Sequence, residues 1–416
     1  MTTTARDPLQ RHVVRTLVGS QMIGGVGLAA GIAVGALIAE EVSGSARWAG
    51  LGSTFQVLGT AVVAVPVVRV MAARGRRAGL VLAYLVAALG AVGIIVAAVV
   101  GSFTLLLAAS LLFGGATTAN NQARYAATDL APPDRRARDL ALVVWATTVG
   151  SVLGPNLATP GEPVARALGL PVLAGPFVFS VAGLLLAAGL LVLRLRPDPL
   201  LEARRRHVES GGVASAVSGS MLHGLRVVAA IPDARLGLLT LVLGHATMVS
   251  IMVMTPLHMA HGAADLEVIG FVISMHILGM FAFSPLTGIA VDRFGGRAVA
   301  LAGSVVLSSA TVLASVSPEG HSPTLLAGLF LLGLGWSCTL VSGSALLTGA
   351  VPVAERPSAQ GSSDLVMSLV AAGGGALAGV VVEASGYRAL SLGALAVAVV
   401  IGLAAALARP RTGQPA

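Results

Sequence analysis

The stretch LVLAYLVAALGAVGIIVAAVV, residues 80–100, contains no charged side chain, and Tyr84 is its only polar one. About 20 apolar residues are enough for a helix to cross the ~30 Å hydrocarbon layer of a membrane. Backbone groups in lipid must be paired internally, so only helices and closed barrels span membranes. Barrel strands alternate polar and apolar residues over about 10 positions, whereas this run is apolar at every position except Tyr84. We therefore predict a membrane-spanning helix here.

Comparable apolar runs recur along the whole chain. Of its 416 residues, 56% are hydrophobic and only 11% are charged, against about 25% charged in soluble domains. The first run is too long for the apolar core of a signal peptide. We predict an all-α integral membrane protein with twelve transmembrane helices. They cover about residues 13–38, 47–70, 78–101, 103–127, 139–159, 171–193, 234–260, 266–289, 298–316, 323–348, 362–383 and 388–408.

The positive charge of the chain is distributed unevenly between the two sides of the predicted helices. The net charge is +8 and all 26 basic residues are arginine. All but Arg47, Arg166 and Arg388 fall on one side or in the segments leading to it. Basic loops stay in the cytoplasm, so we predict that both termini are cytoplasmic. We also expect a multi-pass monomer in the bacterial cytoplasmic membrane. Its surroundings are then the lipid bilayer, and no nucleic acid partner is expected.

The chain divides into two similar halves. A polar stretch separates the sixth and seventh helices, which predicts an amino-terminal bundle over residues 1–194, a cytoplasmic linker over 195–233 and a carboxyl-terminal bundle over 234–416. Three matches at one offset of 220 positions indicate an internal duplication: Gly75 with Gly295, Arg77 with Arg297, and Arg136 with Arg356. Two parallel six-helix halves are typical of alternating-access transporters, which hold the substrate near the membrane midplane between the halves.

Two motifs resemble those of the major facilitator superfamily. GIAVDRFGGR, residues 288–297, is similar to the family's loop signature G-x-x-x-D-R-x-G-x-R, and GSVLGP, residues 150–155, is similar to its helix 5 pattern G-x-x-x-G-P. The resemblance spans the whole chain and implies two pseudo-symmetric six-helix bundles. It also implies that the loop residues hold helix ends together during gating: Gly288, Asp292, Arg293, Gly295 and Arg297. The first-half copy has Ala72 in place of the aspartate.

A histidine in the predicted eighth helix singles out a possible metal path. Met248 and Met252 are four positions apart in the seventh helix, as are His276 and Met280 in the eighth, so each pair shares a helix face. The hairpin between the two helices has its tip near Ala264. If the helices are antiparallel neighbours, Met252 lies at the same depth as His276, and Met248 at the same depth as Met280. Thioethers favour Cu(I), whereas Mg²⁺ and Ca²⁺ require oxygen ligands. Packing is the alternative for the methionines, but an intramembrane histidine is a candidate functional residue.

This pattern, M-x-x-x-M followed by H-x-x-x-M, resembles that of the CcoA-like copper transporters, a bacterial branch of the superfamily. The resemblance implies copper import, with copper as the substrate and no bound cofactor. His245 and the single cysteine, Cys338, are further candidates along such a path. Copper accumulation that survives replacement of Met248 and Met252 by leucine would assign the methionines to packing.

Neutral polar residues in the first half favour a different substrate. An organic solute such as a riboflavin-like compound or a drug would use hydrogen-bonding groups along the path: Gln21, Asn120, Asn121, Gln122 and Asn156. Arg124 and Asp129 are predicted to serve gating electrostatics at the cytoplasmic end. The helix 5 motif is associated with exporters in the family, so the direction of transport stays open. We find no phosphate-binding glycine loop or nucleophile constellation in the sequence, and predict a transporter rather than an enzyme, a sensor or a scaffold.

Overall fold

The computed structural model describes residues 7–44, 48, 51–211, 219–320 and 322–408. All regular elements within these ranges are helices. Arg47 and residues 49 and 50, at the start of the second predicted segment, lie outside the described residues.

Ten helical spans of the described chain are long and apolar enough to cross a membrane. They are α1 (Pro8–Ser43), α2 (Leu51–Arg74), α3 (Arg76–Val100), the pair α4 (Phe103–Phe113) and α5 (Gly115–Ala126), α8 (Gly175–Arg194), α11 (Pro232–His261), the pair α12 (Leu266–Phe281) and α13 (Ser284–Phe294), α14 (Gly296–Val316), α15 (Pro323–Ala350) and α16 (Arg356–Leu407). The bent pair α6 (Arg136–Leu153) and α7 (Ala158–Ala167), with 65° between its arms, is an eleventh.

The twelfth span is contained in α16. This helix is 52 residues long, and Gly386 interrupts its helical backbone with a φ of 80°. A positive φ is readily adopted only by glycine, so the chain turns there and α16 consists of two helices that meet at this residue. The described chain therefore has the twelve transmembrane helices that the sequence predicts.

Three features depart from the predicted segments. The fourth and eighth spans are each broken into two helices. The fifth ends at Leu153 rather than near residue 159, because Pro155 lacks the backbone N–H that a continuing helix requires. The polar linker also contains two helices, α9 (Pro199–Glu209) and α10 (Met221–Ala230). α9 begins with a standard start signal: Asp198 accepts hydrogen bonds from the backbone N–H groups of Leu200 and Leu201, and proline occupies the first helical position.

The described contacts group the chain into two compact units. The first comprises residues 1–132, 139–225 and 352–369, and the second comprises residues 133–138, 226–351 and 370–416. The first residues of α16 therefore belong to the first unit, and a short segment that includes the start of α6 belongs to the second. The sequence-predicted boundaries at residues 194 and 233 stay a prediction.

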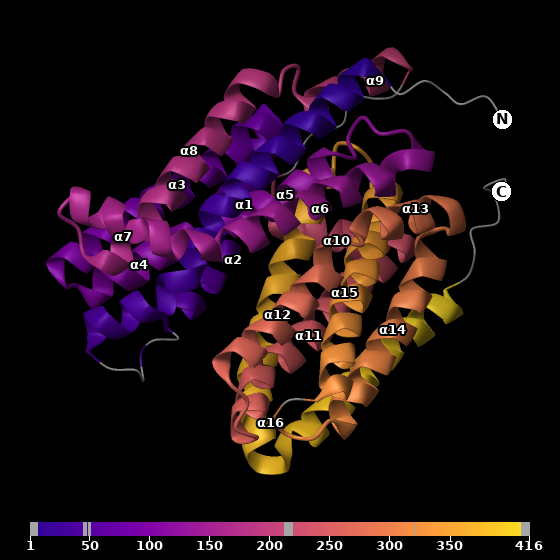
Figure 1. Ribbon diagram of the computed structural model, residues 1–416. Helices are drawn as coiled ribbons and strands as arrows, with labels where there is room; N and C mark the ends of the chain where they lie inside the picture. The colour runs from indigo at the N-terminus through magenta and orange to yellow at the C-terminus, as the bar shows by residue number, and fades with distance from the viewer. Residues whose placement is uncertain (1–6, 45–47, 49–50, 212–218, 321, 409–416) are drawn as a thin grey trace. The chain divides into compact units, whose positions relative to one another are not determined.

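Small residues set the packing inside each unit. In the first, a Cβ on Gly59 would lie 1.8 Å from the carbonyl oxygen of Leu111, so α2 and α4 are in backbone contact there. In the second, α15 packs against α11, α12 and α14 (Figure 1). A Cβ on Gly333 would lie 2.2 Å from the carbonyl oxygen of His276. Lipid offers no hydrophobic drive for helix association, so close backbone approach at small residues supplies the contact energy.

Candidate functional site

His276 lies on α12 with its ring directed at α15. Its side chain is 1% exposed, and Nδ1 lies 2.8 Å from the carbonyl oxygen of Leu329. A carbonyl only accepts hydrogen bonds, so Nδ1 is the donor and the lone pair of the neutral ring is on Nε2. Nε2 is buried and has no hydrogen-bond partner among the described residues. This nitrogen is available to a ligand.

The three methionines of the predicted metal path lie at different degrees of burial. Met248 is buried, whereas Met252 and Met280 are half-buried. Both α11 and α12 pack along α15, and over their described residues they make few contacts with each other. The sequence analysis treated the two helices as antiparallel neighbours, whereas in the structure each packs mainly on α15. The convergence of the four side chains on one ion stays a prediction.

His245 and Cys338 are both engaged within the second unit. The indole N–H of Trp336 donates to Nδ1 of His245 at 2.8 Å, so this ring is held by α15. Cys338 is half-buried on α15, with its Sγ 4.0 Å from the hydroxyl of Thr287 on α13. Whether either residue contacts a transported solute stays a prediction.

A neutral polar cluster lies inside the first unit. Gln21 on α1 is 2% exposed, and its Nε2 donates to the hydroxyl of Thr147 on α6 at 3.2 Å. The amide oxygen of Gln21 is buried without a partner, as is the hydroxyl of Thr148, within the part of the chain that the structure describes. Tyr84 on α3 places its hydroxyl 3.5 Å from the side-chain oxygen of Asn120 on α5. The cluster combines amide and hydroxyl groups, and two of them, on Gln21 and Thr148, have unused hydrogen-bonding capacity.

The G-x-x-x-G-P motif holds α6 against α1 beside this cluster. A Cβ on Gly150 would lie 2.4 Å from the backbone carbon of Gly25, and one on Gly154 would lie 2.3 Å from Cβ of Ala29. The two glycines thus permit backbone contact that any side chain would prevent. Asn156, also in this region, is exposed and donates to the carbonyl of Val152 in its own chain segment, so it does not join the cluster.

Arg124 and Asp129 belong to a buried ionic network in the first unit. Arg76, at the start of α3, is 0% exposed and makes two hydrogen bonds to Asp129, at 2.8 and 3.2 Å. It also donates to Gln360 at 2.6 Å. The guanidinium of Arg356 lies 3.9 Å from the same carboxylate. Charged groups buried this deeply require such partners, because an isolated charge is strongly disfavoured in a low-dielectric environment.

A second ion pair lies beside the first. Arg124 on α5 donates to Asp364 on α16 at 2.5 Å, and the hydroxyl of Tyr125 lies 3.4 Å from the same carboxylate oxygen. Gln122 connects the two pairs, because its Nε2 donates to Asp364 at 2.9 Å while its carbonyl accepts from Arg76 at 3.4 Å. Asn121 accepts from Arg124 at 3.0 Å. Asn121 and Gln122 are thus hydrogen-bonded to ions of the protein itself.

The GIAVDRFGGR loop contacts a helix terminus of the second unit. Asp292 accepts hydrogen bonds from the backbone N–H groups of Ala137 and Arg138, at 3.0 and 2.9 Å, and so caps the start of α6. A carboxylate is favoured there because helix N-termini carry unpaired N–H groups and partial positive charge.

The other residues of this loop have distinct places. Arg297 forms an ion pair with Asp233 at the start of α11. Gly288 is buried in α13, and Gly295 ends α13 with a φ of 85°. Arg293 is exposed, with its guanidinium 5.3 Å from the ring centre of Phe294.

The corresponding loop of the first half uses a residue that the sequence analysis missed. Gly75 has a φ of 88°, matching Gly295, but Ala72 has no carboxylate with which to cap a helix. Asp198, in the linker, approaches Gly75 instead, and it accepts from the N–H of Arg77 at 2.7 Å. Its position before Pro199 signalled a helix start, but its second partner is 121 residues away in the chain. Arg76, Gln360 and Asp364 were also missed.

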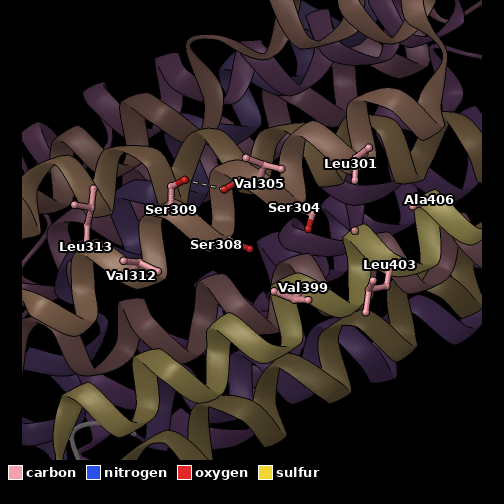
Figure 2. A pocket seen from close by; sticks show the side chains of 11 residues that line it. Leu301, Ser304, Val305, Ser308, Ser309, Val312, Leu313, Val399, Leu403 and Ala406 are labelled. Carbon is pink, nitrogen blue, oxygen red and sulfur yellow. Dashed lines mark hydrogen bonds between the residues drawn. The ribbon is translucent and has the colours of Figure 1, made fainter.

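An apolar cavity of about 650 Å³ lies between α14 and the last part of α16 (Figure 2). Three serines line it, and two of their hydroxyls are already in use: Ser304 donates to the carbonyl of Ala398 at 2.7 Å and Ser309 to that of Val305 at 3.0 Å. The rest of the wall is leucine, valine, glycine and alanine. Such a surface suits hydrocarbon, and it offers little to orient a polar solute.

Comparisons with known proteins agree with this architecture. The model of the Major Facilitator Superfamily matches residues 17–266 and again residues 236–416. The uncharacterized MFS-type transporter YdeG of Bacillus subtilis (strain 168) is 41% identical over 379 residues, which cover 90% of this chain and 86% of that protein. The riboflavin transporter RfnT of Brucella anthropi is 27% identical over 368 residues, 86% of each chain. The human organic anion transporter MFSD10 has a similar fold, with a TM-score of 0.76 at 18% identity over 96% of this chain and 100% of its own. The chain is thus a multi-pass membrane transporter rather than an enzyme, and it belongs to the Major Facilitator Superfamily.

Proposed function

We propose that this protein carries a small, polar and uncharged organic solute. The observation that carries the proposal is Gln21, whose amide is buried in the first unit while its oxygen has no partner among the described residues. An unsatisfied buried polar group costs about 1–3 kcal/mol. A solute that donates a hydrogen bond to Gln21 would recover that free energy while it is bound.

The surrounding groups support an uncharged solute. The hydroxyls of Tyr84, Thr147 and Thr148 and the amide of Asn120 are all neutral. The charged side chains Arg76, Arg124, Asp129 and Asp364 are paired with one another in the ionic network. Neutral donors and acceptors would discriminate among solutes by hydrogen-bond pattern rather than by charge. The 27% identity to the riboflavin transporter RfnT supports the same class, since riboflavin carries several hydroxyl and carbonyl groups.

The experiment measures solute uptake by the full-length protein in proteoliposomes, with radiolabelled riboflavin as the first probe. We expect the substitution Gln21→Leu to reduce uptake at low substrate concentration by about 5- to 100-fold, because one hydrogen bond in a buried site is lost. Asn156→Leu is the control, since Asn156 is exposed and bonds only within its own segment. If riboflavin and a panel of neutral polar solutes all enter equally well with Gln21→Leu, the proposed site is wrong.

Copper import is the second candidate, and one observation favours it. The lone pair on Nε2 of His276 is buried and unpartnered within the described chain, as a ligand for a soft cation would be. Met248 and Met252 lie on α11, and Met280 lies one helical turn after His276 on α12. These four residues would form the relay, with copper as the transported substrate.

A copper experiment separates the two candidates. Cellular copper content is compared between the double variant Met248→Leu/Met252→Leu and the control Met254→Leu, which changes a methionine of the same helix. Loss of copper accumulation only in the double variant would favour the second candidate. Equal accumulation in both strains would assign the methionines to packing.

We also propose the orientation that the arginine distribution predicts, with both termini in the cytoplasm of a bacterial cell and the protein acting as a monomer. A reporter enzyme that is active only outside the cytoplasm, fused after residue 408, tests the orientation. An active reporter would reverse the proposed topology.

A further inference from the structure

A basic cavity of about 530 Å³ lies on the first unit between α1 and α8, which pack side by side (Figure 1). It opens at the first turns of α1 and the last residue of α8. The neutral polar cluster around Gln21 does not contribute to it, and neither does the ionic network around Arg76. The lining residues are Pro8, Arg11, His12, Arg15, Thr16, Gly19, Leu190 and Arg194.

Three arginines of this cavity have no acidic partner within the described residues. Arg11 and Arg15 are exposed and lie one turn apart on the same face of α1. Arg194 ends α8 and faces them across the cavity. The acid next to this group, Asp7, is already paired with Arg206 at 2.7 Å. The cavity therefore holds three positive charges that nothing in its walls neutralises.

His12 fixes the geometry of this basic group. Its Nε2 lies 2.6 Å from the carbonyl oxygen of Arg194, so the ring donates to one of the last carbonyls of α8. This bond joins α1 to α8 at the level of the arginines and holds Arg194 opposite Arg11 and Arg15. The basic end of the cavity, with its three arginines, is thus formed by two helices at a fixed separation.

The cavity continues into an apolar surface that faces outward. Leu190 and Gly19 form its inner end. On α8, Leu186 and Leu193 lie on the same side as Leu190 and are 64% and 73% exposed. Large exposed leucines on a membrane-spanning helix contact the acyl chains of lipids rather than water. A ligand of this cavity therefore meets positive charge at one end and hydrocarbon at the other.

We propose that the cavity binds the headgroup of an anionic phospholipid, with its phosphate among Arg11, Arg15 and Arg194 and its acyl chains along Leu186, Leu190 and Leu193. Basic pockets between transmembrane helices on the cytoplasmic side are suited to anionic headgroups. A free phosphate ion would use the arginines but gain nothing from the leucines. The charge and the adjoining apolar face together select the lipid.

The test measures binding of short-chain phosphatidylglycerol to the purified full-length protein in neutral detergent, by microscale thermophoresis. Short-chain phosphatidylcholine and inorganic phosphate are the comparison probes. We expect phosphatidylglycerol to bind at least tenfold more tightly than either. The variant Arg11→Gln/Arg15→Gln should weaken phosphatidylglycerol binding about 30-fold, from roughly a fivefold loss for each arginine removed next to an anionic lipid.

The matched control is Arg69→Gln/Arg74→Gln, which removes two exposed arginines of α2 and changes the net charge equally. It should leave the affinity for phosphatidylglycerol within twofold of the unsubstituted protein. The charge-preserving variant Arg11→Lys/Arg15→Lys should keep binding within about fivefold, and it serves as the test if the glutamine variant does not fold.

Three results would overturn the proposal. Equal weakening by the two glutamine pairs would mean that only overall charge matters. Inorganic phosphate binding as tightly as phosphatidylglycerol would identify a site for a soluble anion. Equal affinity for the two phospholipids would show that the arginines do not select charge.

Discussion

Among the described residues of the first unit, Arg76 and Asp129 form the most deeply buried ion pair, and their coupling can be measured. Both side chains are 0% exposed, and the guanidinium makes two hydrogen bonds to the carboxylate. Removing one partner of a buried pair costs about 3–5 kcal/mol, because the other charge stays buried without compensation. Arg356, 3.9 Å from Asp129, retains part of the compensation in Arg76→Met. The loss of stability in Arg76→Met should therefore lie toward the lower end of this range.

These values convert to a shift in the midpoint of thermal denaturation. With an unfolding entropy of about 2.1 cal/mol/K per residue over the whole chain, a loss of 3–5 kcal/mol lowers the midpoint by roughly 3–6 °C. We expect this for Arg76→Met and for Asp129→Leu, measured on purified protein in detergent. Arg69→Met, the same change at an exposed position of α2, should shift the midpoint by less than about 1 °C.

The double variant Arg76→Met/Asp129→Leu tests whether the broken ion pair causes the loss of stability in the two single variants. Replacing both charges with apolar groups leaves neither one stranded, and such replacements of buried pairs are often neutral. The double variant should therefore be at least about 2 kcal/mol more stable than the sum of the two single losses. Losses that simply add would show that the two residues stabilise the unit independently, which would refute the reasoning.

Three further predictions follow from local geometry. Gly150→Val places side-chain atoms against the backbone of α1 and should lower the melting midpoint by several degrees, whereas Gly189→Ala, with open space around its Cβ, should not; equal effects would contradict the packing at Gly150. Asp198→Ala removes the cap of α9 and should cost about 1 kcal/mol, seen as a lower midpoint; no change would mean that another group replaces the cap. The hydrogen bond from Arg206 lowers the pKa of Asp7. The stability that this ion pair contributes is therefore complete above the ordinary pKa range of a carboxyl group, and it is lost as the pH falls through the lowered pKa. The difference in midpoint between the unsubstituted protein and Asp7→Asn should hence shrink from pH 7 toward pH 3, and a constant difference would argue against the ion pair.

The helices could be predicted from the sequence because lipid imposes one local rule. A spanning segment must be long, apolar and helical, and each of these properties is visible within about 20 residues. The matching loop glycines could also be predicted, since Gly75 and Gly295 repeat at a fixed offset in the sequence. In the structure both have a positive φ.

Which side chains meet could not be predicted in the same way. Hairpin connection suggested that α11 and α12 pack together, but α15 provides the main packing surface for both. Turn length constrains where two helices begin, not which helix fills the space beside them. Asp364 reaches Arg124 across 240 positions of sequence, and no local pattern records that partner.

The position of residues 352–369 in the first unit has a consequence for dissecting the chain. An amino-terminal fragment ending in the linker would lack Gln360 and Asp364, so Arg124 would lose its carboxylate and Gln122 its acceptor. The carboxyl-terminal fragment would in turn lack residues 133–138, which belong to the second unit, so each fragment would be incomplete by itself. Complementation by co-produced fragments should succeed where refolding of either fragment alone fails.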